Sequence, residues 1–139
     1  YEISNFAKEG YESQHNIKYW QCQEYIGVGL SAHSYLDGVR FAMTDDFDEY
    51  IAGNFERCDE TVLSREDMMS EFMFMGLRMD RGVSKKEFYN RFGVEIHEVF
   101  KEPILKFKNM GMIVEKDGNY CLDKDAVGIS NSIMCEFIL

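Results

Sequence analysis

A hairpin signal near the C-terminus constrains the fold more than any other feature of the sequence. Asp117-Gly118 separates two short runs of strand-forming residues, Ile113–Lys116 and Asn119–Leu122. Asp-Gly readily adopts the positive φ angles of a two-residue turn, whose twist matches that of an antiparallel pair. The sequence therefore predicts a β-hairpin at residues 113–122.

Helix signals precede and follow this hairpin. Ser64 is placed to cap a helix with acidic residues in its first turn, and a methionine-rich apolar stripe extends from it to a predicted stop at Gly82. Residues 84–87 form a capping box for a second helix that ends at Gly93.

A third helical stretch covers residues 99–111, where Pro103 marks either a kink or a fresh first turn. A last helix is predicted over residues 125–138. Three helices, a hairpin and a last helix predict a winged-helix-like arrangement.

The first third of the chain has the pattern of strands and loops. Residues 1–7 alternate apolar and polar side chains, as a half-buried strand does. Residues 25–36 form a continuous apolar and small-residue run, which is typical of a strand buried on both faces. A turn at Asp37-Gly38, a return strand at residues 39–43 and a short helix at residues 47–52 follow.

Charge and cysteine content exclude several classes of partner. The formal net charge is −10, and residues 1–59 hold four Lys or Arg against eleven Asp or Glu. Such a surface repels phosphate backbones, so nucleic acid is a poor partner. No apolar run approaches the ~20 residues of a membrane span. Four scattered cysteines are typical of reduced thiols, so we expect a cytoplasmic protein.

The strongest chemical signal is the run His15-Asn16-Ile17-Lys18-Tyr19-Trp20, called here the His-Asn-x-x-Tyr-Trp box. An imidazole nitrogen can ligate haem iron, and flat aromatic rings can enclose a flat apolar ligand. Asn16 would then orient a propionate or hold a loop. The alternative makes His15 and Asn16 loop-forming residues, with Tyr19 and Trp20 in the core.

Several motifs in register extend this signal over nearly the whole chain. They are residues 1–7, Gly10-Tyr11, the box, residues 25–36, Arg40-Phe41, residues 71–78 and Asn131. In this order and spacing, the sequence resembles the oxygen-independent coproporphyrinogen III oxidase-like radical S-adenosylmethionine proteins. Within them it resembles the HemW-type haem chaperones, which the box distinguishes.

The resemblance implies an α+β fold with two parts. Residues 1–58 would be the C-terminal edge of a partial α/β barrel, and residues 59–139 a winged-helix-like domain with a β-hairpin. The resemblance also implies haem binding at the box, with His15 as the iron ligand. Three residues would line the S-adenosylmethionine pocket of the intact protein, namely Gly27, Gly29 and Ser31.

Radical chemistry in this family needs a [4Fe–4S] cluster held by a Cys-x-x-x-Cys-x-x-Cys loop, and thiolates are the usual ligands of such clusters. The cysteines of this chain are Cys22, Cys58, Cys121 and Cys135, and none has that spacing. The chain also begins at Tyr1 rather than at Met. We therefore expect a C-terminal piece of a longer protein that does not catalyse a reaction by itself. Its exposed barrel edge would favour self-association.

The function implied is haem binding and transfer to an acceptor protein that the sequence does not identify. One alternative is a true oxygen-independent coproporphyrinogen III oxidase, which decarboxylates two propionates of a porphyrinogen. Another is a partner-docking module formed by residues 60–139.

Overall fold

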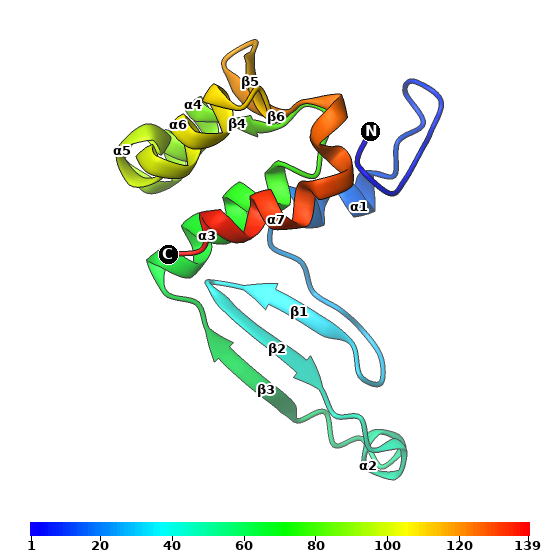
Figure 1. Cartoon of the computed structure of the whole chain (residues 1–139). Helices are drawn as coiled ribbons and strands as arrows, with labels where there is room; N and C mark the ends of the chain where they lie inside the picture. The colour runs from blue at the N-terminus through cyan, green and yellow to red at the C-terminus, as the bar shows by residue number, and fades with distance from the viewer. The chain divides into compact units, whose positions relative to one another are not determined.

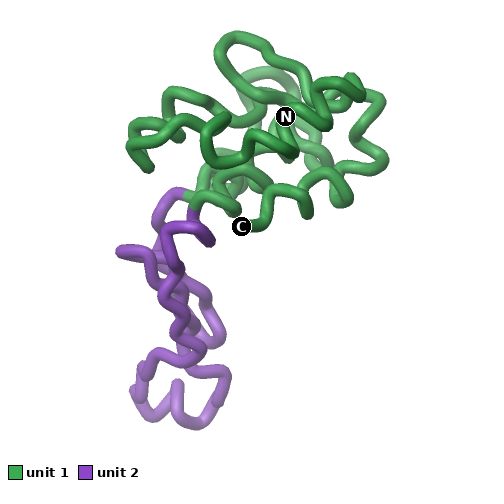
Figure 2. The backbone as a smooth tube through the Cα atoms, turned by 60° about the vertical axis from the view of Figure 1, so that its left-hand side comes forward, with its two compact units in different colours: residues 1–22, 69–139 green, residues 23–68 purple.

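The computed structural model describes residues 1–139, which divide into two compact units (Figure 2). The larger unit comprises residues 1–22 and 69–139, and the smaller comprises residues 23–68. Helices alternate with short strands, and every strand pair is antiparallel. The predicted α+β class is confirmed. The division expected at residue 58 concerns the longer protein and stays a prediction.

The capping signals place the start of α3 (Arg65–Gly76) and both ends of α4 (Lys85–Phe92) correctly. Two further helices, α5 (Ile96–Val99) and α6 (Lys101–Asn109), follow. The Ser84 hydroxyl accepts a hydrogen bond from the Glu87 amide at 3.2 Å, and Gly93 ends α4 in the left-handed conformation. Pro103 lies in the first turn of α6, where its missing N–H costs no helical hydrogen bond.

The predicted hairpin is present and belongs to a three-stranded sheet. Strands β5 (Ile113–Lys116) and β6 (Asn119–Leu122) meet at Asp117-Gly118, where both residues have positive φ. A short strand that the sequence did not indicate, β4 (Val83–Ser84), pairs with the free edge of β6 to give the order β4-β6-β5. Sheet and helices together form the predicted winged-helix-like arrangement.

Gly82 has a different role from the predicted one. Helix α3 ends at Gly76, six residues before the expected stop. Gly82 has a φ of +70°, and a Cβ atom there would lie 2.2 Å from the Tyr120 carbonyl oxygen. The glycine therefore permits close backbone contact with β6 and does not end the helix.

A chain of aromatic rings forms the core of the larger unit. Phe88, Phe100 and Phe137 are almost fully buried, and neighbouring rings of the set lie 4.7–6.4 Å apart. These distances suit edge-to-face and offset packing. The set is Phe72, Phe88, Phe92, Phe100, Phe107 and Phe137.

The C-terminal segment, predicted as one helix, is broken into three. The pieces are the 3₁₀ helix η1 (Lys124–Ile129), α7 (Ser130–Met134) and the 3₁₀ helix η2 (Cys135–Phe137). Helix α7 runs beside α3 (Figure 1), and the Leu139 amide donates to the Ser70 hydroxyl at 3.0 Å. No helix of the chain combines the length and apolar composition needed to cross a bilayer.

The N-terminal segment departs from its predicted strand. In residues 1–7 only Glu2 pairs, through an isolated antiparallel bridge to Met79. Residues assigned to loops form the helix α1 (Gln14–Trp20), whose N-cap Ser13 accepts a hydrogen bond from the Asn16 amide at 3.3 Å. The alternation of residues 1–7 was a weak signal, because no neighbouring strand is present to extend it.

The smaller unit is a three-stranded meander. Its strands β1 (His33–Leu36), β2 (Val39–Met43) and β3 (Arg57–Val62) pair in the order β1-β2-β3, and α2 (Phe47–Ile51) connects the last two. The predicted turn at Asp37-Gly38 is confirmed.

The prediction of a buried strand over residues 25–36 is wrong for most of its length. Only His33–Leu36 is a strand, and Val28 is 90% exposed. Gly29 and Ser31 have φ of +121° and +57°, which interrupts an extended backbone.

Candidate functional site

The His-Asn-x-x-Tyr-Trp box lies on α1, and its spacing is helical. Residues four apart share a helix face, so the box consists of two pairs, His15 with Tyr19 and Asn16 with Trp20. The two pairs point in directions about 100° apart. The alternative in which His15 and Asn16 form a loop is wrong, because both lie within the helix.

His15 and Tyr19 form an accessible pair of metal-ligand types. The Tyr19 hydroxyl lies 3.0 Å from the His15 Nε2 atom in a hydrogen bond, and the two rings meet edge to face at 4.8 Å. His15 is exposed and Tyr19 half-buried. Imidazole nitrogen and phenolic oxygen are both known protein ligands of haem iron.

Asn16 anchors the helix to the start of the chain. Its Nδ2 atom donates to the Tyr1 hydroxyl at 3.3 Å, and both side chains are partly buried. Asn16 therefore fixes the position of α1, which also carries the exposed His15–Tyr19 pair.

Trp20 packs under the guanidinium group of Arg78. The Arg78 Cζ atom lies 4.6 Å from the Trp20 ring centroid, a cation–π arrangement. The Arg78 Nη2 atom donates to a Glu2 carboxylate oxygen at 3.3 Å and to the Ser4 hydroxyl at 2.9 Å. The Trp20 Nε1 and Arg78 Nε atoms are buried without a hydrogen-bond partner.

Glu2 is the buried acid in the cluster that it forms with Arg78, Ser4 and Trp20. Burial disfavours its charged form, but hydrogen bonds from the Asn5 side chain and the Ser4 backbone, with the charge of Arg78, outweigh it and lower the Glu2 pKa. The carboxylate is therefore charged and paired at neutral pH. This cluster joins the first residues of the chain to the end of α3.

Trp20 also lines a groove of about 400 Å³. One wall comes from α3 and the turn after it, and the other from α7 and the residues that follow. The lining residues are Trp20, Phe74, Met75, Arg78, Asn131, Met134, Cys135 and Ile138.

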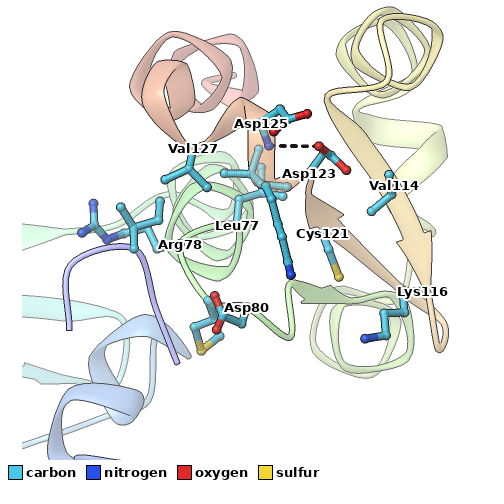
Figure 3. A pocket seen from close by; sticks show the side chains of 13 residues that line it. Leu77, Arg78, Asp80, Val114, Lys116, Cys121, Asp123, Asp125 and Val127 are labelled. Atoms are coloured by element: carbon cyan, nitrogen blue, oxygen red, sulfur yellow. Dashed lines mark hydrogen bonds between the residues drawn. The ribbon is translucent and has the colours of Figure 1, made fainter. Parts of the chain in front are cut away.

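A larger cavity of about 650 Å³ lies on the hairpin side of the same unit (Figure 3). Both charge signs line it, with Lys116 from β5 and with Asp80, Asp123 and Asp125 from the segments around it. The Arg78 guanidinium points away from the other labelled residues (Figure 3). No box residue lines this cavity.

Gly27, Gly29 and Ser31 lie in the smaller unit, in the loop before β1. A Cβ atom at Gly27 would lie 2.2 Å from the His33 carbonyl oxygen, so the close backbone approach expected of a strand glycine occurs at this loop position. The Gly27 amide donates to the Ser34 hydroxyl and the Ser31 amide to the Thr44 carbonyl, both at 3.0 Å. Their role in an S-adenosylmethionine pocket stays a prediction.

None of the four cysteines forms a disulfide, and their spacing in the sequence does not match a cluster loop. Burial raises the pKa of Cys121, and its thiol donates to the Arg81 carbonyl at 3.3 Å. These residues do not provide the three-cysteine loop of a [4Fe–4S] cluster.

Sequence reasoning did not find Glu2, Arg78 or the groove. Met75 belongs to the methionine-rich stripe predicted after Ser64, and it lines the groove. The available signal was a second apolar stripe at helical spacing in the C-terminal segment, on the face of Met134 and Ile138.

Known proteins match both the sequence and the fold. The chain is 33% identical over 141 residues to the heme chaperone HemW of Lactococcus lactis, an alignment that covers 100% of this chain and 37% of that protein. The Bacillus subtilis heme chaperone HemW is also 33% identical, over 99% of this chain and 38% of the relative. Residues 63–127 match the family HemN C-terminal domain.

Residues 63–127 thus resemble the HemN C-terminal domain, and the whole chain is similar to part of the heme chaperones HemW. A solved structure supports this fold: the radical SAM enzyme coproporphyrinogen III oxidase (HemN) from Escherichia coli, with a TM-score of 0.64. At 11% identity the likeness covers 84% of this chain and 28% of that one. The chain thus spans less than two-fifths of the length of these two curated relatives.

Proposed function

We propose that this chain is the C-terminal portion of a longer radical S-adenosylmethionine family protein that binds haem and transfers it to an acceptor protein. The observation that carries the proposal is the His15–Tyr19 pair within the box, in which the imidazole is exposed. The heme chaperones among the relatives supply the ligand class.

An accessible ligand pair suits transfer better than permanent storage. His15 would hold haem iron through Nε2, the atom that now bonds to the Tyr19 hydroxyl, and Tyr19 would supply an oxygen donor close by. Because His15 is exposed, a ligand from an acceptor protein can approach the iron and replace the imidazole. Asn16 keeps the helix in place during the exchange through its bond to Tyr1.

The [4Fe–4S] cluster and most of the S-adenosylmethionine site belong, in this proposal, to the remainder of the longer protein. Gly27, Gly29 and Ser31 would complete the S-adenosylmethionine pocket there. The reduced thiols support a cytoplasmic protein. Porphyrinogen decarboxylation is the second candidate, supported by the fold likeness to the Escherichia coli oxidase. An oxidase assay on the longer protein separates the two functions.

Haem titration of the longer protein, followed by absorbance, tests the role of His15. We expect His15→Ala to weaken haem binding by about tenfold or more and to shift the Soret band. His97→Ala is the matched control, because His97 is also an exposed helical histidine. Equal affinity and identical spectra for wild type and His15→Ala would remove His15 as a ligand.

A further inference from the structure

We propose that an exposed apolar surface on α2 is a docking site for a protein partner, which binds it through a basic amphipathic segment. This surface, called here the α2 patch, consists of Phe47, Tyr50, Ile51 and Phe55. Haem takes no part in this docking, so a failed docking experiment would leave the proposed function standing.

Helix α2 has one apolar face, and that face is open to solvent. Phe47, Tyr50 and Ile51 are spaced i, i+3 and i+4, so they lie on one side of the helix. The Phe55 ring meets the Tyr50 ring edge to face at a centroid distance of 5.3 Å, which extends the face beyond the end of the helix. Phe47, Ile51 and Phe55 are 59–68% exposed, and α2 has no buried residue. The core of the smaller unit therefore does not use this face.

Hydrogen bonds hold the α2 patch in shape without covering it. The Asp46 carboxylate caps the helix by accepting from the Glu49 amide at 3.0 Å, and after the turn the Asn54 amide donates to the Glu49 carbonyl, also at 3.0 Å. Within the smaller unit, α2 lies beyond the ends of β2 and β3 (Figure 1). A face that is already ordered loses less conformational entropy when a partner binds it.

The charges around the α2 patch identify the chemistry of the partner. Residues 45–56 hold five acidic residues and no Lys or Arg, and all five acids are exposed. They are Asp45, Asp46, Asp48, Glu49 and Glu56. A segment with Lys or Arg beside its apolar residues would pair with these carboxylates at the rim, while its apolar side chains cover the rings.

The same charges disfavour two other occupants. A second copy of this chain on the same face would bring two sets of five carboxylates together, and like charges across an interface cost affinity. A membrane surface that contains anionic lipids would be repelled for the same reason, although exposed Phe and Ile side chains can enter a bilayer interface. A basic amphipathic protein segment complements both the apolar side chains and the acids.

Two synthetic helical peptides of about 18 residues test this docking on the longer protein. The Lys peptide carries Leu on one face and Lys on the other, and the Glu peptide has Glu in place of each Lys. In fluorescence anisotropy we expect the longer protein to bind the Lys peptide at least about tenfold more tightly than the Glu peptide. Added salt should weaken the binding of the Lys peptide, because exposed charges are screened.

Variants at constant charge test the apolar side chains. Phe47→Ser combined with Ile51→Ser removes two exposed apolar groups, and we expect at least about tenfold weaker binding of the Lys peptide. Val62→Ser is the matched control, because Val62 is also exposed but lies at the opposite end of β3 from α2. Circular dichroism should show the same helix content in all variants, since Ser suits a helix about as well as Phe or Ile.

A second variant tests the acids while it keeps the apolar side chains. Asp45→Asn, Asp48→Asn and Glu56→Gln together remove three exposed charges and leave the Asp46 cap of the helix in place. We expect this triple variant to bind the Lys peptide about fivefold more weakly than wild type, with a smaller dependence on salt.

Four results would overturn the proposal. Unchanged binding of the Lys peptide in the Phe47→Ser, Ile51→Ser variant would mean that the peptide responds to net charge alone. A dimer of the longer protein that this variant abolishes in sedimentation would identify a second copy as the occupant. Binding to phosphatidylcholine vesicles that the variant abolishes would identify a lipid surface instead. Absence of Lys-peptide binding to wild type, with loss of stability in the variant or without it, would mean that the α2 patch does not take a basic segment.

Discussion

The two units differ in how they use their apolar residues. In the larger unit, aromatic side chains meet in one core, and Phe88 and Phe137 are almost fully buried. In the smaller unit, Tyr35 and Phe41 are buried, but six large apolar side chains are exposed by 59–90%. These exposed residues are Ile26, Val28, Phe47, Ile51, Phe55 and Val62. An apolar-rich sequence therefore makes a core only where several elements converge, and a three-stranded sheet alone does not.

Removal of a central aromatic ring from the larger unit should change the free energy of unfolding more than any other variant considered. Phe88→Ala should lower the free energy of unfolding of the larger unit by about 3–5 kcal/mol, because it opens a cavity among several rings. Tyr89→Ala, half exposed on the same helix, should cost less than about 1 kcal/mol. Val28→Asp in the smaller unit should be nearly neutral. Urea unfolding followed by circular dichroism measures all three, and equal losses would contradict the contrast between the units.

Alanine substitutions at two glycines distinguish the cost of a steric clash from the cost of a positive φ angle. Gly82→Ala should destabilise the larger unit by about 3 kcal/mol, because its methyl group would meet the Tyr120 carbonyl. Gly118→Ala has a similar positive φ in open space, so it should cost about 1–2 kcal/mol. Thermal unfolding of the two variants gives the difference. Similar costs would mean that contact with β6 does not constrain Gly82.

The caps of α4 and α2 allow the two units to be compared through the same type of hydrogen bond. Ser84 caps α4 and Asp46 caps α2, each through a side-chain oxygen that accepts a backbone N–H. Ser84→Ala should cost about 1 kcal/mol of global stability. Asp46→Ala should change the same measurement by less than about 0.5 kcal/mol, because α2 has one turn and no buried residue. A larger effect at Asp46 would show that α2 supports a core after all.

Acid titration should give the smallest effect. The Glu2 pKa in the folded chain lies below its ordinary value of 4.5, so the stabilisation is complete above that pH and is lost as the pH falls toward the folded pKa. Asp67 and Glu115 also have lowered pKa values and act in the same direction. Glu2→Gln should therefore show a shallower loss of stability below pH 4.5 than wild type. Identical slopes for Glu2→Gln and wild type would contradict the role of Glu2 and Arg78 in acid stability.

Local signals predicted the larger unit well. Ser84, Gly93 and Asp117-Gly118 each act through their own backbone, so spacing alone was enough to place α4 and the hairpin. The run of residues 25–36 failed because composition does not specify backbone angles.

The candidate site was predictable in part for the same reason. The four box residues were already adjacent in the sequence, and the i, i+4 spacing would have placed them on a helix. Glu2 was not predictable, because its burial depends on Arg78, which lies 76 residues away in the sequence. The groove was not predictable either, since the residues of its two walls, such as Met75 and Met134, lie far apart in the sequence.

Because the box is helical, the two residues between Asn16 and Tyr19 set the relative directions of the side chains on either side of them. One residue inserted between Asn16 and Tyr19 would rotate the downstream rings by about 100° and separate both pairs at once. The identities of Ile17 and Lys18 matter far less than their number. Distant relatives with two residues of any type between the Asn and the Tyr should therefore keep both side-chain pairs. Relatives with more or fewer residues there should lose them.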